Sequence, residues 1–192
     1  MSHWAEGYTQ RELDDAQIRY GLRFPPDLIA LLLERRPRNG YNWAIEDKRI
    51  RRMLIHPLKM LQFDVEQGFW WPDWGDRPGT EPERLEVLQA ALARVPRLIP
   101  LIAHRFIPEE PSLAGNPVFS MYGFDTIYYG ATLNEYFDNE FNGRYAIGPV
   151  RHIRFWSDFV ENWDVGHAYF EQARGLGQFP EISPNLESPK RN

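Results

Sequence analysis

The residues best suited to acid–base chemistry in this sequence are His104, Arg105 and Asp125. His104 and Arg105 are adjacent, and Asp125 lies in the next predicted hairpin, where its carboxylate could orient His104 as a general base. In the alternative interpretation, Arg105 pairs with a carboxylate for structural reasons and His104 caps the end of a strand. The sequence favours this alternative, because no nucleophile or metal ligand accompanies the three residues. We therefore predict no catalytic residues.

Asn116 is a further polar candidate, in the segment Gly115-Asn116-Pro117. The residue before a proline is biased toward an extended backbone, so the Asn116 amide could simply bridge two strands. It could also bind a ligand, because turns next to strands often carry function. The sequence therefore leaves open a small-molecule pocket, which would lie near His104, Arg105, Asn116, Asp125 and Tyr128.

Three tryptophans, Trp70, Trp71 and Trp74, lie within five positions of a sequence that is 15% aromatic. Buried, they would form a lid over one end of the core, with each indole N–H bound to a carbonyl. Exposed, they would form an aromatic platform of the kind that dominates protein interfaces. Trp70 and Trp71 are adjacent, so an extended segment could not easily point both inward. With Asp73 and Asp76 beside them, these residues are the candidate partner-binding surface.

The sequence lacks the other familiar signatures of chemistry. It contains no Gly-rich phosphate loop, no G-x-S-x-G turn and no H-E-x-x-H helix. Its five histidines are scattered singly, and the absence of cysteine excludes disulfides and thiolate zinc sites. We therefore expect no cofactor and no metal ion.

The charge of the chain is unevenly distributed. The net charge is −5 and the mean hydropathy is −0.54, which argues against nucleic acid as the default partner. Residues 35–59, however, contain eight basic and two acidic residues. This basic band is either a solvated helix face or a docking surface for an acidic partner.

No apolar run approaches the roughly 20 residues that span a bilayer, and the N-terminal residues do not resemble a secretory signal. We therefore expect no membrane association and a cytoplasmic location.

The elements that must position these residues follow from periodicity and capping patterns. Helices are predicted from a capping box at Thr9 and Glu12 to Gly21, from Pro26, over 48–54, from Pro57 to Gly68, over 82–95, after Thr132, and from Ser157 through Trp163 to His167. Strands are predicted over 98–102, 105–107, 117–122, 126–130 and 151–155. Helices, then neighbouring strands, then helices indicate an α+β fold with a twisted, mainly antiparallel sheet. We predict one domain over residues 1–175 and a mobile tail over 176–192.

Several of these segments together resemble a known family. They are Leu22-Arg23-Phe24-Pro25-Pro26-Asp27, Asn39-Gly40, His56-Pro57-Leu58, Phe69-Trp70-Trp71, His104-Arg105-Phe106-Ile107-Pro108, Gly115-Asn116-Pro117-Val118 and Asp125-Thr126-Ile127-Tyr128. The pattern resembles the SUKH superfamily, which contains the Smi/Knr-type regulators of yeast cell-wall synthesis and many bacterial proteins. It covers about residues 9–141, and residues 142–175 would be a helical extension.

The resemblance implies an α+β fold and no enzymatic activity. It implies a protein-binding module, most often an immunity protein that binds and neutralises a polymorphic toxin such as a nuclease or deaminase. A small-molecule-sensing or regulatory domain remains the alternative. The resemblance carries over no catalytic or contact residue, and it leaves the oligomeric state open.

Overall fold

The computed structural model of the chain describes residues 2–145 and 147–162. In this part of the chain, seven α-helices combine with a two-stranded and a four-stranded antiparallel sheet, which confirms the predicted α+β class. The elements, in chain order, are β1 (Trp4–Glu6), α1 (Gln10–Tyr20), α2 (Pro26–Glu34), β2 (Arg35–Pro37), α3 (Lys48–Leu54), α4 (His56–Glu66), the 3-10 turn η1 (Pro72–Trp74), α5 (Glu81–Leu92), β3 (Leu98–Ile102), β4 (Arg105–Pro108), β5 (Val118–Ser120), β6 (Ile127–Gly130), α6 (Leu133–Asn142) and α7 (Trp156–Glu161).

The four-stranded sheet has the order β3-β4-β5-β6, so β5 is an interior strand, as its apolar residues on both faces predict. Its register separates two faces. Arg105 pairs with Ser120, whereas Phe106 pairs with Phe119. Because side chains alternate along a strand, the Arg105 side chain and the Phe106 side chain leave the sheet on opposite faces.

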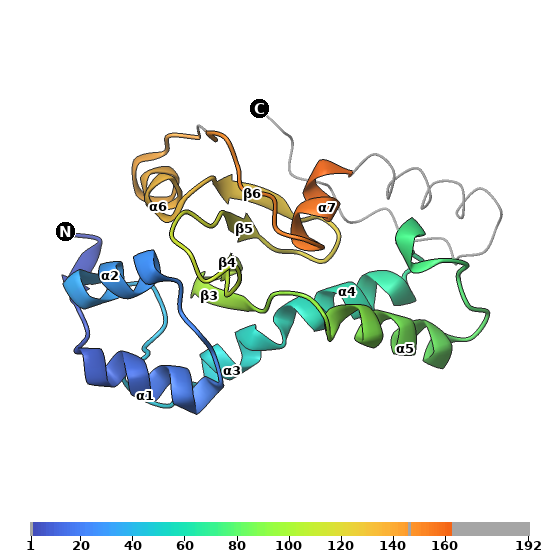
Figure 1. Cartoon of the computed structure of the whole chain (residues 1–192), viewed down its shortest axis with the longest axis horizontal. Coiled ribbons are helices and arrows are strands. Elements are labelled where there is room, and N and C mark those ends of the chain that lie inside the picture. The colour runs from blue at the N-terminus through green and yellow to red at the C-terminus, as the bar shows by residue number, and fades with distance from the viewer. Residues whose placement is uncertain (1, 146, 163–192) are drawn as a thin grey trace, which may run out of the picture.

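Each face of this sheet is covered by its own apolar core. Helices α1, α2 and α6 contribute Leu13, Leu28 and Tyr136 to the first core, where they join Ile107 and Val118 of the sheet. Helices α4, α5 and α7 contribute Leu61, Leu88 and Phe159 to the second, where they join Phe106 and Phe119. Figure 1 shows α1 and α2 together at one end of the molecule, and α4 and α5 side by side toward the other.

Local capping fixes several helix ends where the sequence predicts them. The Thr9 hydroxyl accepts the Glu12 amide at 3.3 Å, and the Glu12 carboxylate accepts the Thr9 amide at 2.7 Å. Gly21 ends α1 with φ +62°, in the left-handed region that favours glycine. Helix α3 spans residues 48–54 as predicted, and Asp47 caps it by accepting the Arg49 amide at 2.8 Å.

Two predictions about the C-terminal part of the described chain are wrong. Residues 151–155 do not form a strand, and residues 154 and 155 form a turn. The Ile153 amide donates to the Ser157 hydroxyl and the Ile153 carbonyl accepts the Ser157 amide, at 2.8 Å each. Helix α7 therefore begins at Trp156, and Ser157 lies inside it rather than at its cap. The predicted helical residues Trp163 and His167 and the predicted tail over 176–192 lie outside the described residues.

The sheet of β1 and β2 is not predicted by the sequence. It pairs Trp4 with Pro37 and Glu6 with Arg35, so it joins segments about thirty residues apart. In the described ranges, no helix is long and apolar enough to cross a membrane.

Candidate functional site

The tryptophan cluster belongs mainly to the second core. Trp70 is 1% exposed and Trp71 is 7% exposed, while Trp74 is half-buried. The Trp70 indole N–H donates to the Gly75 carbonyl at 2.7 Å. The Trp71 ring packs on Phe124 and Phe159, with ring centres 6.1 and 4.8 Å apart. The exposed-platform interpretation is therefore wrong for Trp70 and Trp71, because both rings are buried among the side chains of the second core.

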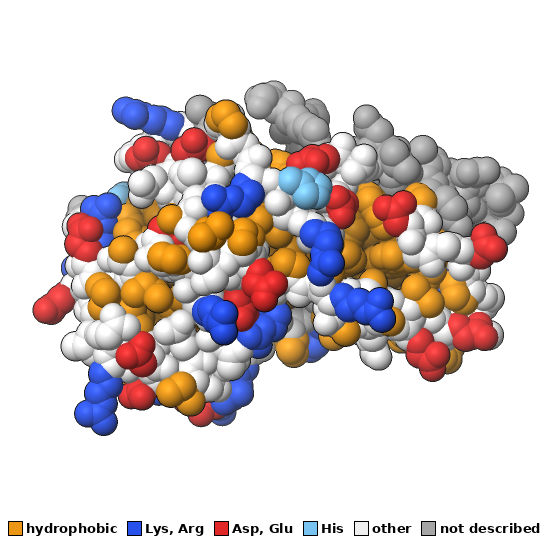
Figure 2. Space-filling view, viewed as in Figure 1, with side chains coloured by type: hydrophobic (Ala, Val, Ile, Leu, Met, Phe, Trp, Pro, Cys, Tyr) orange, Lys and Arg blue, Asp and Glu red, His pale blue; other side chains and the backbone are white. Residues whose placement is uncertain are grey.

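The ring contacts of Trp70 and Trp74 position the turn that carries Asp73 and Asp76. Both aspartates are exposed. Trp74 between them packs edge-on against Trp70, with ring centres 5.3 Å apart. Gly75 has φ +80°, which lets the chain reverse directly after Trp74. The exposed carboxylates of Glu81, Glu83 and Glu86 follow at the start of α5, and Figure 2 shows acidic side chains gathered at this end of the molecule. We call Asp73, Asp76 and these three glutamates the acidic end.

Arg105 lies on the other face of the sheet, where it binds side chains from three elements. Its Nη1 donates to the Ser120 hydroxyl at 2.9 Å, and its guanidinium lies 3.9 Å from the centre of the Tyr129 ring. Its Nε is 3.9 Å from a carboxylate oxygen of Glu140 in α6. This contact with Glu140 is of the kind that the structural interpretation of Arg105 expects. Nearby, the Tyr136 hydroxyl is buried and has no hydrogen-bond partner among the described residues.

His104 precedes Arg105 at the β3–β4 turn and contacts its guanidinium. The His104 ring also packs edge-on against Tyr122, with centres 4.9 Å apart, and Tyr122 packs in the same way against His56, at 5.9 Å. Burial, with the positive charge of Arg105 and then His56, lowers the pKa of His104 to about 4. His104 is therefore neutral at pH 7, and this pKa lies too low for an efficient general base.

Asp125 does not support His104. Its side chain is exposed, its backbone amide donates to the Tyr122 carbonyl at 3.1 Å, and no described contact joins its carboxylate to the His104 ring. The candidate catalytic pair is therefore not assembled in this structure.

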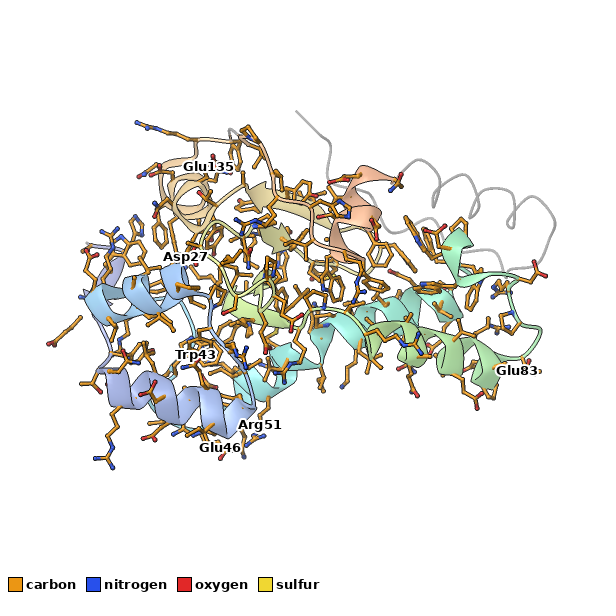
Figure 3. The ribbon with its side chains drawn as sticks, in the orientation of Figure 1. Asp27, Trp43, Glu46, Arg51, Glu83 and Glu135 are labelled. Carbon is orange, nitrogen blue, oxygen red and sulfur yellow. The ribbon has the colours of Figure 1, made fainter. Side chains whose placement is uncertain are left out.

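Both polar atoms of the Asn116 side-chain amide form hydrogen bonds within the fold. It is buried, and its Nδ2 donates to the carbonyls of Pro108 and Pro111 at 3.3 and 2.8 Å. Its Oδ1 accepts a hydrogen bond from Arg151 at 2.7 Å. The amide thus ties the end of β4 to the loop that follows it, a structural role as predicted, although it joins a strand to a loop rather than two strands. A second tie to this loop comes from Asp27 in α2, which accepts the Gly115 amide at 2.9 Å and is labelled in Figure 3.

Tyr128 lies on the face of the sheet opposite to Arg105, because it pairs with Phe119. Its hydroxyl donates to Glu161 of α7 at 2.7 Å. The five predicted pocket residues therefore occupy separate places: His104 with Arg105, Asn116 in the loop after β4, Asp125 on a turn, and Tyr128 against α7. The prediction that they line one pocket is wrong, because the alternation of the strands and the length of β4 keep them apart.

The carboxyl of Asp64 is a feature that the sequence analysis missed. It accepts the Phe124 amide at 2.8 Å, and burial raises its pKa to about 7, with a smaller contribution from Asp125. Gly123 makes this approach possible, because a Cβ at residue 123 would lie 1.8 Å from a carboxylate oxygen of Asp64. The hairpin glycine was visible in the sequence, but nothing there pointed to its partner on α4.

Within residues 2–145 and 147–162, no group of three or more His, Asp or Glu side chains could hold a metal ion. Comparison of the chain with protein-family models, with characterised proteins and with solved structures finds no match.

Proposed function

We propose that this chain is a non-catalytic protein-binding module of the SUKH type, and that it acts as an immunity protein which binds and neutralises a basic toxin such as a nuclease or deaminase. The family assignment rests on the segments of sequence quoted above. The α+β fold, with an antiparallel sheet between helices, is compatible with it.

The observation that carries the proposal is the rigid presentation of the acidic end. A tight inhibitor gains affinity when its contact residues are fixed before binding, because less conformational entropy is then lost on binding. Asp73 and Asp76 flank Trp74, which packs against Trp70, and the Trp70 indole is bonded to Gly75. Exposed carboxylates on such a turn would steer a basic partner toward it.

Arg84 adds to this rigidity without pairing with the exposed aspartates. Its Nη1 donates to the carbonyls of Pro78 and Gly79, at 3.1 Å each. The capping bonds between Thr80 and Glu83 then fix the start of α5, with the shorter at 2.7 Å. The loop from Trp74 to α5 is thereby held by its own hydrogen bonds.

The test captures partners of the tagged full chain from cells of its source organism and then expresses each captured protein in a neutral host. We expect one captured protein to be toxic alone and harmless when this chain is co-expressed. The double substitution D73K/D76K should abolish the rescue. D14K/D15K makes the same charge change on exposed residues of α1 and should retain it.

Two results would reject the proposal at different levels. If no captured protein is toxic, or if co-expression does not relieve toxicity, the chain is not an immunity protein. If D73K/D76K rescues as well as the unsubstituted chain, the partner binds elsewhere than the acidic end.

A further inference from the structure

A small cavity lies where β2, the loop after it and α3 meet. Its volume is about 250 Å³, and the side chains that give it its character are Arg36, Arg38, Arg49, Tyr8, Tyr41 and Asn42. The lining contains three guanidinium groups and no carboxylate. The basic band of the sequence is therefore folded, in part, into a concave site rather than spread along one solvated helix.

Two of the arginines are positioned by β2 and its pairing with β1. Arg36 lies in β2 and Arg38 in the turn that directly follows it, and both residues line the cavity. The Arg36 guanidinium lies 4.7 Å from the centre of the Tyr8 ring. Tyr8 is itself fixed, since its hydroxyl donates to the Tyr41 carbonyl at 3.1 Å and accepts the Trp43 amide at 3.2 Å. The Arg38 backbone is held to the His3 carbonyl at 2.9 Å.

The third arginine comes from α3. Asp47 holds the Arg49 guanidinium, with 2.9 Å between Nη2 and a carboxylate oxygen, and this guanidinium lies 5.7 Å from the centre of the Tyr41 ring. The Tyr41 hydroxyl donates to the Ala103 carbonyl at 2.8 Å, which anchors the loop to the β3–β4 turn. These hydrogen bonds and ring contacts thus fix the cavity wall, and they leave the guanidinium N–H donors of Arg36 and Arg38 unused.

No ion pair joins Arg36 or Arg38 to any carboxylate among the described residues. The Glu12 carboxylate, which Arg36 also influences, is already bonded to the Thr9 amide and hydroxyl. Two guanidinium groups therefore line the cavity without an ion-pair partner, whereas the third, that of Arg49, is paired with Asp47.

We propose that this cavity binds a phosphate group. Planar guanidinium groups bind phosphate through paired, charge-assisted hydrogen bonds, and a phosphate dianion matches the excess of positive charge better than a single carboxylate does. The cavity is slightly smaller than the roughly 300–1,000 Å³ of whole-ligand pockets, so it suits one anionic group rather than a large molecule. This site lies apart from the acidic end and does not depend on the proposed function.

The test is calorimetric titration of the full chain with inorganic phosphate and with phenyl phosphate at constant ionic strength. We expect saturable binding of one phosphate group per chain. Each of R36Q and R38Q should weaken it about tenfold or more, the usual effect of losing a charge-assisted bond. Tighter binding of phenyl phosphate would identify an organic phosphate as the ligand, whereas equal binding would identify the free ion.

Arg35 provides the matched control. It precedes Arg36 on β2, but it lies over the Trp4 ring at 4.4 Å and 3.9 Å from Glu34, outside this cavity. R35Q removes the same charge and should leave phosphate affinity unchanged within about threefold. Circular dichroism checks that each variant is folded. Arg38 is exposed, so R38Q keeps the test decisive if R36Q, which loses its contact with Tyr8, does not fold.

Three results would overturn the proposal. These are no saturable binding of either probe, an equal loss in R35Q and R38Q, or binding of duplex DNA that phenyl phosphate does not displace. The last result would assign the arginines to a nucleic-acid surface instead.

Discussion

Substitution of Asp64 by Asn should stabilise the protein at pH 8 and leave its stability nearly unchanged at pH 4. Burial raises the pKa of Asp64 to about 7 in the folded protein, against an ordinary value of 3.8. The folded state therefore holds a proton that the unfolded state has already released at pH 5 or 6. The stability that this proton contributes is complete below about pH 4 and is lost as the pH rises to about 7.

The size of the effect follows from the same two pKa values. A difference of one in pKa corresponds to about 1.4 kcal/mol, so the change from 3.8 to about 7 gives an upper limit of about 4 kcal/mol. Asn at residue 64 keeps an oxygen that can accept the Phe124 amide, which Asp64 accepts at 2.8 Å, but it cannot ionise. The advantage of D64N over the unsubstituted chain should therefore grow through this interval and level off above pH 8.

Urea denaturation at intervals from pH 4 to pH 8, followed by tryptophan fluorescence, measures this difference. Comparing the two proteins at each pH matters, because the lowered pKa of His104 acts in the opposite direction and reduces stability as the pH falls below about 6.5. E66Q, which changes an exposed carboxylate on the same helix, is the control and should give no such divergence. Parallel profiles for D64N and the unsubstituted chain would refute the reasoning, as would a D64N that is less stable at pH 8.

Three further substitutions test the packing of the site by the same denaturation measurement. G123A should cost at least about 2 kcal/mol, because its φ of +62° disfavours a Cβ and that Cβ would meet the Asp64 carboxylate at 1.8 Å; a neutral effect would show that this approach does not exist. W71A should cost about 3–5 kcal/mol, as a large core side chain does, whereas an exposed ring would cost less than about 1 kcal/mol. N116A should cost about 2–4 kcal/mol, because it removes the donor to the buried Pro108 carbonyl and the part-buried Pro111 carbonyl; a loss below about 0.5 kcal/mol would contradict this structural role.

The elements that the sequence predicts well are those fixed by neighbours in the chain. The capping bonds of Thr9 and the left-handed Gly21 that ends α1 involve residues at most four positions apart. Helix α3 is predicted to the residue because Asp47 caps it locally. In each case one turn of backbone contains all the interacting groups, so the residue types alone determine the outcome.

Two of the failures have the opposite character, because each depends on a contact between distant segments. The pairing of Trp4 with Pro37 leaves no alternating pattern in two strands of three residues. Asp64 lies sixty positions from the Phe124 amide that it accepts. Residues 151–155 show a different, local error: Ile153 and Phe155 alternate as in a strand, but the hydrogen bonds of Ile153 go to Ser157, four positions along the chain, instead of to a partner strand.

The prediction of a common pocket is wrong for a specific geometric reason. The sequence leaves open a pocket near His104, Arg105, Asn116, Asp125 and Tyr128, which lie in or beside neighbouring predicted strands. The register decides otherwise. Tyr128 pairs with Phe119, while Arg105 pairs with Ser120, and a difference of one position in register moves a side chain to the opposite face. Strand register cannot be read from the sequence, so the sequence alone could not show that Tyr128 and Arg105 lie on opposite faces of the sheet.

The distribution of charge over the molecule determines how the two proposed sites can act. The cavity of Arg36, Arg38 and Arg49, here called the arginine cavity, is lined by residues of β1, β2 and α3, whereas the acidic end precedes and begins α5. Figure 3 shows Glu83 at one end of the molecule, well away from Glu46 and Arg51 beside α1 and α3. Helix α4, which lies between them along the chain, has 11 residues and is therefore about 16 Å long. This exceeds the screening length of about 8 Å at physiological ionic strength.

The two sites are consequently screened from each other, and the net charge of −5 describes neither of them. A basic protein would be drawn to the acidic end and a phosphate group to the arginine cavity, each by its local potential. Binding at one site should then leave the affinity at the other unchanged, unless a conformational change couples them. D73K/D76K should therefore bind phosphate like the unsubstituted chain, and R38Q should still rescue cells from the toxin.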